Sequence, residues 1–228
     1  MKKKYYKFEL DIKKMNILIF IGFIPLGVVF GIFSNFFSNT FDKLYISLTG
    51  LILVFFIHEL IHGIGYSLFA KDKSKIKYGI ALDKGVLYAM CQDTISKTGI
   101  LVSLMLPTII LTFILLPIGI IIKDSILVFL ALMNLYGAIG DIMMCTLAIR
   151  LPKDTEYIDY NADIGAYFIS KEDISQMKTF GFKCIESGTH TLDKVDNTIP
   201  RFTVTKGSII YLVIFGLIIL LDFIVSIL

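Results

Sequence analysis

The chain lacks the residues on which several common protein classes depend. It has only three cysteines among 228 residues, and Cys91, Cys145 and Cys184 form no CxxC pair. This number and spacing argue against both a disulfide framework and a zinc knuckle. No run of basic residues interleaved with aromatic ones suggests a nucleic-acid-binding surface. Internal repeats and low-complexity segments are also absent.

Charged residues are scarce as well. They make up 18% of the chain, whereas 56% of the residues are hydrophobic and the mean hydropathy is +0.78. Soluble domains are about a quarter charged, so this composition indicates a membrane protein. Five apolar runs are long enough to cross a hydrocarbon core of about 30 Å as helices: residues 16–37, 44–70, 98–122, 125–149 and 208–228. We therefore expect an all-α polytopic membrane protein with about five transmembrane helices.

The basic residues predict the orientation of these helices. They gather in three segments, residues 2–14, 71–97 and 150–206, whereas the two short loops on the other side hold only Lys43 and Lys123. The positive-inside rule places the three basic segments and the N-terminus in the cytoplasm, and the C-terminus outside. No small-x-small cleavage site follows the first apolar run, so we expect a retained signal-anchor helix.

Two polar stretches have their own expected structures. In residues 75–94, two β-favouring runs flank Asp83-Lys84-Gly85, which predicts a β-hairpin lying against the cytoplasmic interface. Residues 150–207 are too few for more than a small α+β cytoplasmic appendage with a thin core. The expected organisation is a membrane domain over residues 1–149, this appendage, and a last helix over residues 208–228.

The most informative motif is His58-Glu59-Leu60-Ile61-His62, inside the second apolar run. It uses two of the three histidines in the chain. Positions i and i+4 share one face of a helix, so both imidazoles can reach one metal ion while Glu59 holds a water. Ionisable groups at membrane depth are costly and usually mark a functional site. The alternative is a structural polar cluster.

Catalytic zinc needs three protein ligands and an open position. Asp141 is the only acidic residue inside the fourth apolar run. At 1.5 Å per residue, His58 and Asp141 both lie roughly 20–25 Å from the outer surface. We therefore predict Asp141 as the third ligand beside His58 and His62. Asn134, two helical turns earlier, is a candidate for orienting the carboxylate or binding a substrate carbonyl, or it serves only as a contact between helices.

Several neighbours of the motif have simpler expected roles. Gly137 and Gly140 would let another backbone approach closely. Cys145 is expected to pack as a small apolar residue. Pro107 and Pro117 are expected to kink the third helix.

These features together resemble a known family. The segment 55–70, the hairpin-like loop, Pro107 and the stretch from Asn134 to Asp141 are similar to the bacterial putative zincin peptidase membrane family, which is related to site-two intramembrane metalloproteases. The resemblance covers about residues 51–168. It implies a bacterial plasma-membrane protein that binds zinc through His58, His62 and Asp141 and activates water with Glu59. One departure is that Gly140 precedes the aspartate here, whereas in site-two proteases a glycine follows it.

The sequence thus predicts a zinc-dependent endopeptidase that cleaves a membrane-embedded or membrane-adjacent peptide, with a membrane protein or peptide as substrate. The hairpin would capture an unwound substrate by β-addition. The alternative function is a non-proteolytic membrane zinc-binding protein that holds a partner helix. A transporter is a third possibility, but neither an inverted repeat nor paired broken helices are seen.

Overall fold

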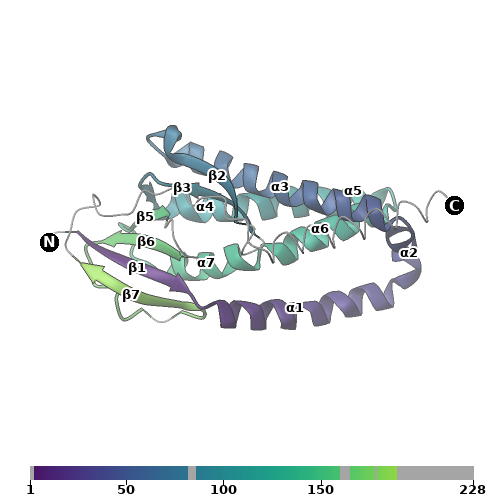
Figure 1. Ribbon diagram of the computed structural model, residues 1–228, viewed down its shortest axis with the longest axis horizontal. Helices are drawn as coiled ribbons and strands as arrows, with labels where there is room; N and C mark the ends of the chain where they lie inside the picture. Colours follow the sequence, from purple (N-terminus) through teal and green to yellow (C-terminus); the bar gives the residue numbers. More distant parts are fainter. Residues whose placement is uncertain (1–2, 82–85, 160–164, 178, 189–228) are drawn as a thin grey trace.

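The computed structural model describes residues 3–81, 86–159, 165–177 and 179–188. Long helices run side by side, with a β-sheet gathered at one end and α2 at the other (Figure 1). The helices are α1 (Ile12–Ile32), α2 (Ser34–Asp42), α3 (Leu44–Phe69), α4 (Lys97–Pro107), α5 (Phe113–Ile121), α6 (Ser125–Gly137) and α7 (Ile139–Arg150). The strands are β1 (Lys4–Leu10), β2 (Ile76–Ala81), β3 (Val86–Cys91), β4 (Ile95–Ser96), β5 (Glu156–Asp159), β6 (Gly165–Ser170) and β7 (Phe182–Gly188).

Three helical segments are long and apolar enough to cross a membrane, over residues 13–32, 44–69 and 97–121. The pair α6 and α7 would make a fourth span, with a bend of 44°. The second and third predicted helices, 44–70 and 98–122, therefore match the structure closely. The predicted fifth helix, 208–228, lies outside the described residues.

The first predicted helix, 16–37, differs from the structure at both ends. α1 begins earlier because the Asp11 side chain accepts hydrogen bonds from the amides of Lys13 and Lys14, which caps the helix. The chain then leaves helical geometry at Phe33, and α2 continues as a separate short helix. Lys13 and Lys14, at the end of the basic flank, are thus part of the helix itself.

The third span is interrupted after Pro107, where a kink was predicted. α4 ends at Pro107 and is followed by a π-helical segment, Thr108–Thr112, before α5 begins. Pro107 cannot donate a backbone hydrogen bond, and π-helical turns of this kind often occur at functional sites. Pro117 lies inside α5.

The described residues are mostly helical, as predicted, but the strands reach beyond the expected hairpin and the expected small α+β appendage. Five strands form an antiparallel sheet in the order β4-β5-β6-β1-β7. The strand β1 alternates in burial, with Tyr6, Phe8 and Leu10 facing the core, as a strand with one buried face requires. The strand was not predicted, because the lysines in this segment are also typical of a basic flank before a transmembrane helix.

This sheet joins the three lysine-rich segments. It combines β1 from the N-terminal segment, β4 from the segment before α4, and β5 to β7 from the segment after α7. All three segments therefore lie at the same end of the helices, in agreement with the charge pattern; their cytoplasmic location stays a prediction. The core beneath the sheet includes Phe8, Phe168, Ile100 and Leu147.

The predicted hairpin is confirmed. β2 and β3 pair antiparallel, with Ile76 opposite Cys91 and Ala81 opposite Val86. Both strands contact α3, and Figure 1 shows the hairpin beside the helices near the sheet end. The hairpin therefore lies next to the part of α3 that carries the histidine motif.

Candidate metal centre

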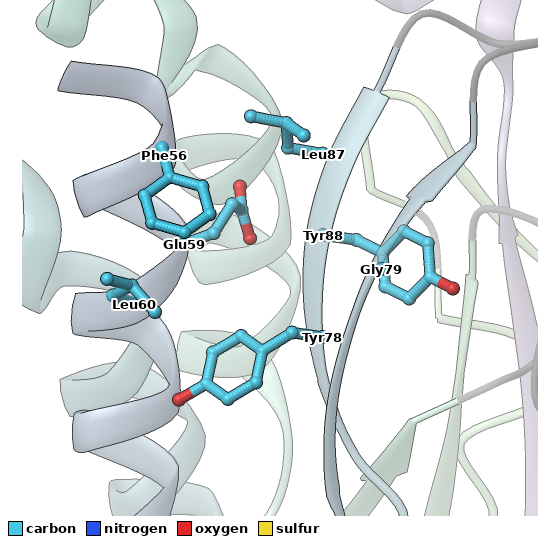
Figure 2. A pocket seen from close by; sticks show the side chains of 7 residues that line it. All are labelled: Phe56, Glu59, Leu60, Tyr78, Gly79, Leu87 and Tyr88. Carbon is cyan, nitrogen blue, oxygen red and sulfur yellow. The ribbon is translucent and has the colours of Figure 1, made fainter. Parts of the chain in front are cut away.

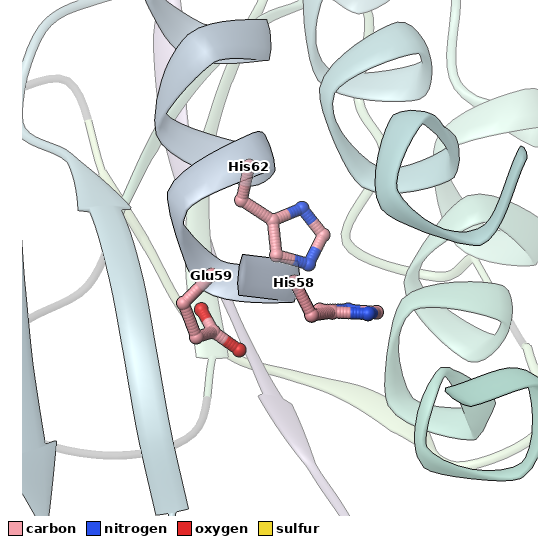
Figure 3. A group of neighbouring side chains, drawn as sticks. All are labelled: His58, Glu59 and His62. Carbon is pink, nitrogen blue, oxygen red and sulfur yellow. The ribbon is translucent and has the colours of Figure 1, made fainter. Parts of the chain in front are cut away.

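Three side chains of α3 form the centre of the candidate site. His58 and His62 lie one turn apart and are 6% and 4% exposed. Figure 3 shows both imidazole rings on one side of the helix and the Glu59 carboxylate pointing another way. One potential ligand atom from each of the three residues lies within 4.8 Å of those of the other two. The motif spacing therefore gathers these groups as the helical period predicts.

Asp141 reaches this cluster from α7. Its Oδ2 atom lies 3.1 Å from Nε2 of His58 and 3.4 Å from Nε2 of His62. Ligand atoms bound tetrahedrally to zinc at about 2.0–2.2 Å are roughly 3.3–3.6 Å from one another. The two distances are close to this spacing, so the carboxylate and the two imidazoles lie near enough to bind one small ion together.

A break between α6 and α7 positions Asp141. The predicted continuous helix over residues 125–149 is wrong, because α6 ends at Gly137 and α7 begins at Ile139. The break places Asp141 in the first turn of α7. Unpaired amide groups and the helix dipole make this end of a helix favourable for an anion.

The orientation of His62 is fixed by α4. Its Nδ1 atom lies 2.8 Å from the carbonyl oxygen of Ser103. A carbonyl can only accept, so Nδ1 carries the proton and Nε2 of the neutral ring keeps its lone pair for a metal. Gly65 makes this contact possible, because a Cβ atom there would lie 2.7 Å from Cα of Ser103.

The orientation of His58 is fixed by a chain of three hydrogen bonds. His58 Nδ1 lies 2.8 Å from Oδ1 of Asn134, and Nδ2 of Asn134 donates to Oγ1 of Thr112 at 2.9 Å. The Thr112 hydroxyl in turn donates to the carbonyl oxygen of Ala131 at 3.4 Å. Since that carbonyl only accepts, the Thr112 oxygen is left to accept from Asn134. The Asn134 oxygen then faces His58, whose Nδ1 donates and whose Nε2 faces Asp141.

Asn134 therefore lies beside His58 rather than beside the Asp141 carboxylate. It is fully buried, which supports a positioning role over direct contact with substrate. Thr112, in the π-helical segment, and the Ser103 carbonyl were not found from the sequence. A serine or a threonine does not by itself indicate such a role in a sequence. Ser103 acts through its backbone carbonyl, and Thr112 acts through a hydrogen bond to Asn134 rather than to a histidine.

The two glycines near Asp141 differ from each other. A Cβ atom at Gly137 would lie 2.8 Å from Cε1 of Phe55 on α3, so this glycine does permit a close helix contact. Among the residues that the structure describes, no atom lies within 4 Å of such a Cβ at Gly140, so the expected close approach there stays a prediction. Cys145 packs in the hydrophobic core, as predicted.

Glu59 faces the hairpin. Its Oε2 atom accepts a hydrogen bond from the backbone N–H of Ala89 in β3 at 2.6 Å. A pocket of about 360 Å³ lies here between α3 and the hairpin, and Figure 2 shows Phe56, Glu59 and Leu60 on one side with Tyr78 and Leu87 opposite. The carboxylate thus lies between the metal ligands and an open pocket.

A second carboxylate holds the hairpin. The Asp159 side chain accepts a hydrogen bond from the backbone N–H of Cys91 at 3.2 Å. Burial raises the pKa of the Cys91 thiol to about 11, so this cysteine is a thiol rather than a thiolate at neutral pH. Within the described residues, Cys91 therefore contributes packing and a backbone donor rather than a metal ligand.

Comparison with known proteins agrees with this chemistry. A model of the family described as putative zincin peptidase matches residues 51–155. No curated protein and no solved structure matches the chain significantly. The family match supports a zincin-like family and a zinc metallopeptidase, and the matched residues include both motif histidines, Glu59 and Asp141.

The residues present fit a zinc ion. Neutral imidazole nitrogens and a carboxylate oxygen are usual zinc ligands, and three of them leave a fourth position open. In this structure both histidines have their Nδ1 atoms engaged by oxygen acceptors, the arrangement typical of histidines that bind metal through Nε2. The cluster of two histidines and Glu59 could itself hold a metal ion.

Proposed function

We propose that the chain is a zinc-dependent endopeptidase that cleaves a peptide bond within or next to the membrane. The observation that carries this proposal is the pairing of His58, His62 and Asp141 at zinc-ligand spacing with Glu59 turned toward a pocket. The apolar helices around the site support a membrane location. The substrate would be a membrane protein or peptide, with the lipid bilayer as surroundings and no nucleic acid as partner.

Each residue has a separate duty in this reaction. His58, His62 and Asp141 would hold the ion, and bound zinc makes a coordinated water acidic enough to act near neutral pH. Glu59 accepts a proton from the attacking water on a carboxylate oxygen and delivers it to the leaving amine nitrogen. Asn134 and the Ser103 carbonyl keep the two imidazoles in the tautomer that leaves Nε2 free.

The hairpin supplies a place for the substrate backbone. Because the N–H of Ala89 points away from β2 toward Glu59, alternation along the strand turns the N–H of Leu87 the same way. A peptide unwound from its helix would pair with this edge of β3, which satisfies backbone groups that lipid leaves without partners. The scissile bond would then lie beside Glu59.

One observation favours the alternative, a zinc-binding membrane protein without protease activity that holds a partner helix. The hydrogen bond from the Ala89 N–H to Glu59 gives this carboxylate a structural role that does not depend on catalysis. In that case Glu59 would anchor the hairpin rather than act as a base.

The variant Glu59→Gln separates the two functions. Glutamine keeps an oxygen that accepts from Ala89 and leaves the three ligands intact, but it cannot act as the base, a role typically worth about 10²–10⁴-fold in rate. Wild type and Glu59→Gln would be expressed in the native host, with zinc content measured on purified protein and membrane proteomes compared. A protease predicts normal zinc and an uncut protein that accumulates only in the variant. Unchanged proteomes with normal zinc would favour the structural zinc protein.

A further inference from the structure

We propose that the pocket between α3 and the hairpin receives one large apolar side chain of the substrate, from a residue that flanks the scissile bond. This inference rests on the proposed endopeptidase function and names its substrate class. The pocket is lined by Phe56, Glu59, Leu60, Tyr78, Gly79, Leu87 and Tyr88. Its volume of about 360 Å³ falls in the range of sites that enclose a small ligand.

The position of the pocket ties it to the reaction. Glu59 lines it, and the same carboxylate lies within 4.8 Å of the potential ligand atoms of His58 and His62. Adjacent residues of a peptide are 3.8 Å apart at their Cα atoms. A peptide with its reacting carbonyl beside Glu59 therefore has a neighbouring side chain within reach of the pocket.

The walls of the pocket set its depth. Figure 2 shows the Tyr78 ring extending from the hairpin toward α3, whereas the Tyr88 ring points away from the helix. Gly63 permits this arrangement, because a Cβ atom there would lie 1.8 Å from the Tyr78 hydroxyl. The tyrosine thus lies against α3 one turn beyond Glu59 and closes that end. Leu60 and Leu87 form the facing walls.

The chemistry of the walls selects the occupant. Apart from the Glu59 carboxylate and the two tyrosines, the lining is hydrocarbon and phenylalanine ring. An acidic side chain would be repelled by Glu59, and a basic one would bind the carboxylate that the reaction needs. An extended peptide places alternate side chains on opposite faces, so one side chain enters while its neighbours point elsewhere. Leucine, phenylalanine and methionine fit; aspartate, lysine and glycine do not.

The test uses purified protein with zinc and, as the probe, peptides from a tryptic digest of a bacterial membrane fraction. Cleavage sites found with wild type but not with Glu59→Gln would be identified by mass spectrometry. We expect large apolar residues to be enriched on one side of these sites. For a synthetic peptide that is cleaved, replacing that residue by alanine should lower kcat/KM at least about tenfold.

Variants of residues that line the pocket test whether the pocket determines the residue preference at the cleavage site. Leu87→Ala widens it and should shift the preferred residue toward larger side chains, and Leu60→Phe narrows it and should shift the preference toward smaller ones. Leu68→Phe is the matched control, because this leucine is on the same helix, is 66% exposed and does not line the pocket. Zinc content and the unfolding temperature would check that each variant is folded.

Further outcomes would overturn the inference in distinguishable ways. Cleavage that depends on Glu59 but shows no apolar preference, or a preference unmoved by both wall variants, would remove the subsite and leave the protease; a lipid tail would then be the better occupant. Zinc-loaded wild type that cleaves no peptide would remove the proposed function and the subsite with it. Binding of leucine hydroxamate no tighter than that of glycine hydroxamate to the zinc-loaded Glu59→Gln protein would also remove the subsite, without reference to cleavage.

Discussion

His58 donates a hydrogen bond from Nδ1 to Oδ1 of Asn134, with 2.8 Å between the two atoms. This contact decides which nitrogen of His58 is free for a metal ion. The amide of Asn134 is itself oriented by Thr112, which is 3% exposed. The state of one histidine on α3 therefore depends on a hydroxyl in the π-helical segment Thr108–Thr112.

The variant Thr112→Val should weaken zinc binding, because valine cannot accept from Nδ2 of Asn134 and the amide loses its fixed orientation. Loss of partners behind metal ligands typically costs about 10–100-fold in affinity, and we expect about tenfold here. Thr112→Ser keeps the hydroxyl and is the matched control. Titration of zinc into metal-free protein, with cobalt absorption as a second readout, measures both. Equal affinities in the two variants would show that the hydroxyl does not orient Asn134.

The purified protein should bind about one zinc ion per chain. His62→Ala removes a ligand and Asp141→Asn replaces an anionic ligand with a neutral one, so both should lower zinc content. His190→Ala, which changes the third histidine of the chain, is the control. Metal analysis after dialysis gives the answer, and full zinc occupancy in His62→Ala would make the ligand assignment wrong.

Proline at Leu87 should reduce peptide cleavage while zinc content stays normal. The N–H of Leu87 faces the open edge of β3, and proline removes that donor without changing the metal ligands. Leu87→Val keeps the N–H and should be much less harmful. Cleavage rates and zinc content would be compared for both variants. Equal cleavage by the proline and valine variants would argue against β-addition at this edge.

Asp93 should stabilise the protein above about pH 4. Burial raises the pKa of its carboxyl, but the amides of Asp72, Thr94 and Lys71 lower it more, so that the pKa lies below the ordinary value of 3.8. Two of these amides donate to Oδ2 at 2.7 and 2.8 Å, from Lys71 and Asp72. The stabilisation is therefore fully present above the ordinary pKa and is lost as the pH falls through the lower, folded-state value.

Asp93→Asn should accordingly lower the unfolding temperature by several degrees at pH 7, because a hydrogen bond to a charged group contributes about 1.5–3 kcal/mol. The difference from wild type should shrink below about pH 4. Asp42→Asn, which changes an exposed aspartate at the end of α2, controls for loss of a surface charge. The unfolding temperatures of wild type and Asp93→Asn would be measured in detergent across this pH range. A difference between them that does not change with pH would contradict the proposed role of the Asp93 carboxylate.

The three lysine-rich segments should be cytoplasmic. A cysteine at Ser38, in α2, should react with an impermeant thiol reagent in intact cells, whereas one at Ser74 should not. Cys91 and Cys145 are buried, so Cys184→Ser gives a suitable background. The reverse labelling pattern would overturn the orientation.

The sequence predicted that His58, Glu59 and His62 cluster, because this follows from the helical period, whereas their depth in the membrane stays a prediction. It missed the break at Ala138, since residues 125–149 have uniform apolar character and the break depends on packing against α3. It missed β1 because Lys7 and Glu9, which alternate with Tyr6, Phe8 and Leu10, mask a buried alternating face. The roles of Thr112 and the Ser103 carbonyl could not be predicted from the sequence, because they depend on which helices lie side by side.

The position of β1 in the sheet has a consequence for how the protein is made. β1 lies between β6 and β7, and the hydrogen-bonded pair Tyr5 and Glu186 is separated by 181 residues. Synthesis at about 5–20 residues per second puts roughly 10–40 s between the two partners. Meanwhile α1 to α7 are made without a completed sheet to hold their ends together. The strand β1 is thus paired in the sheet only after the last of these helices has been made.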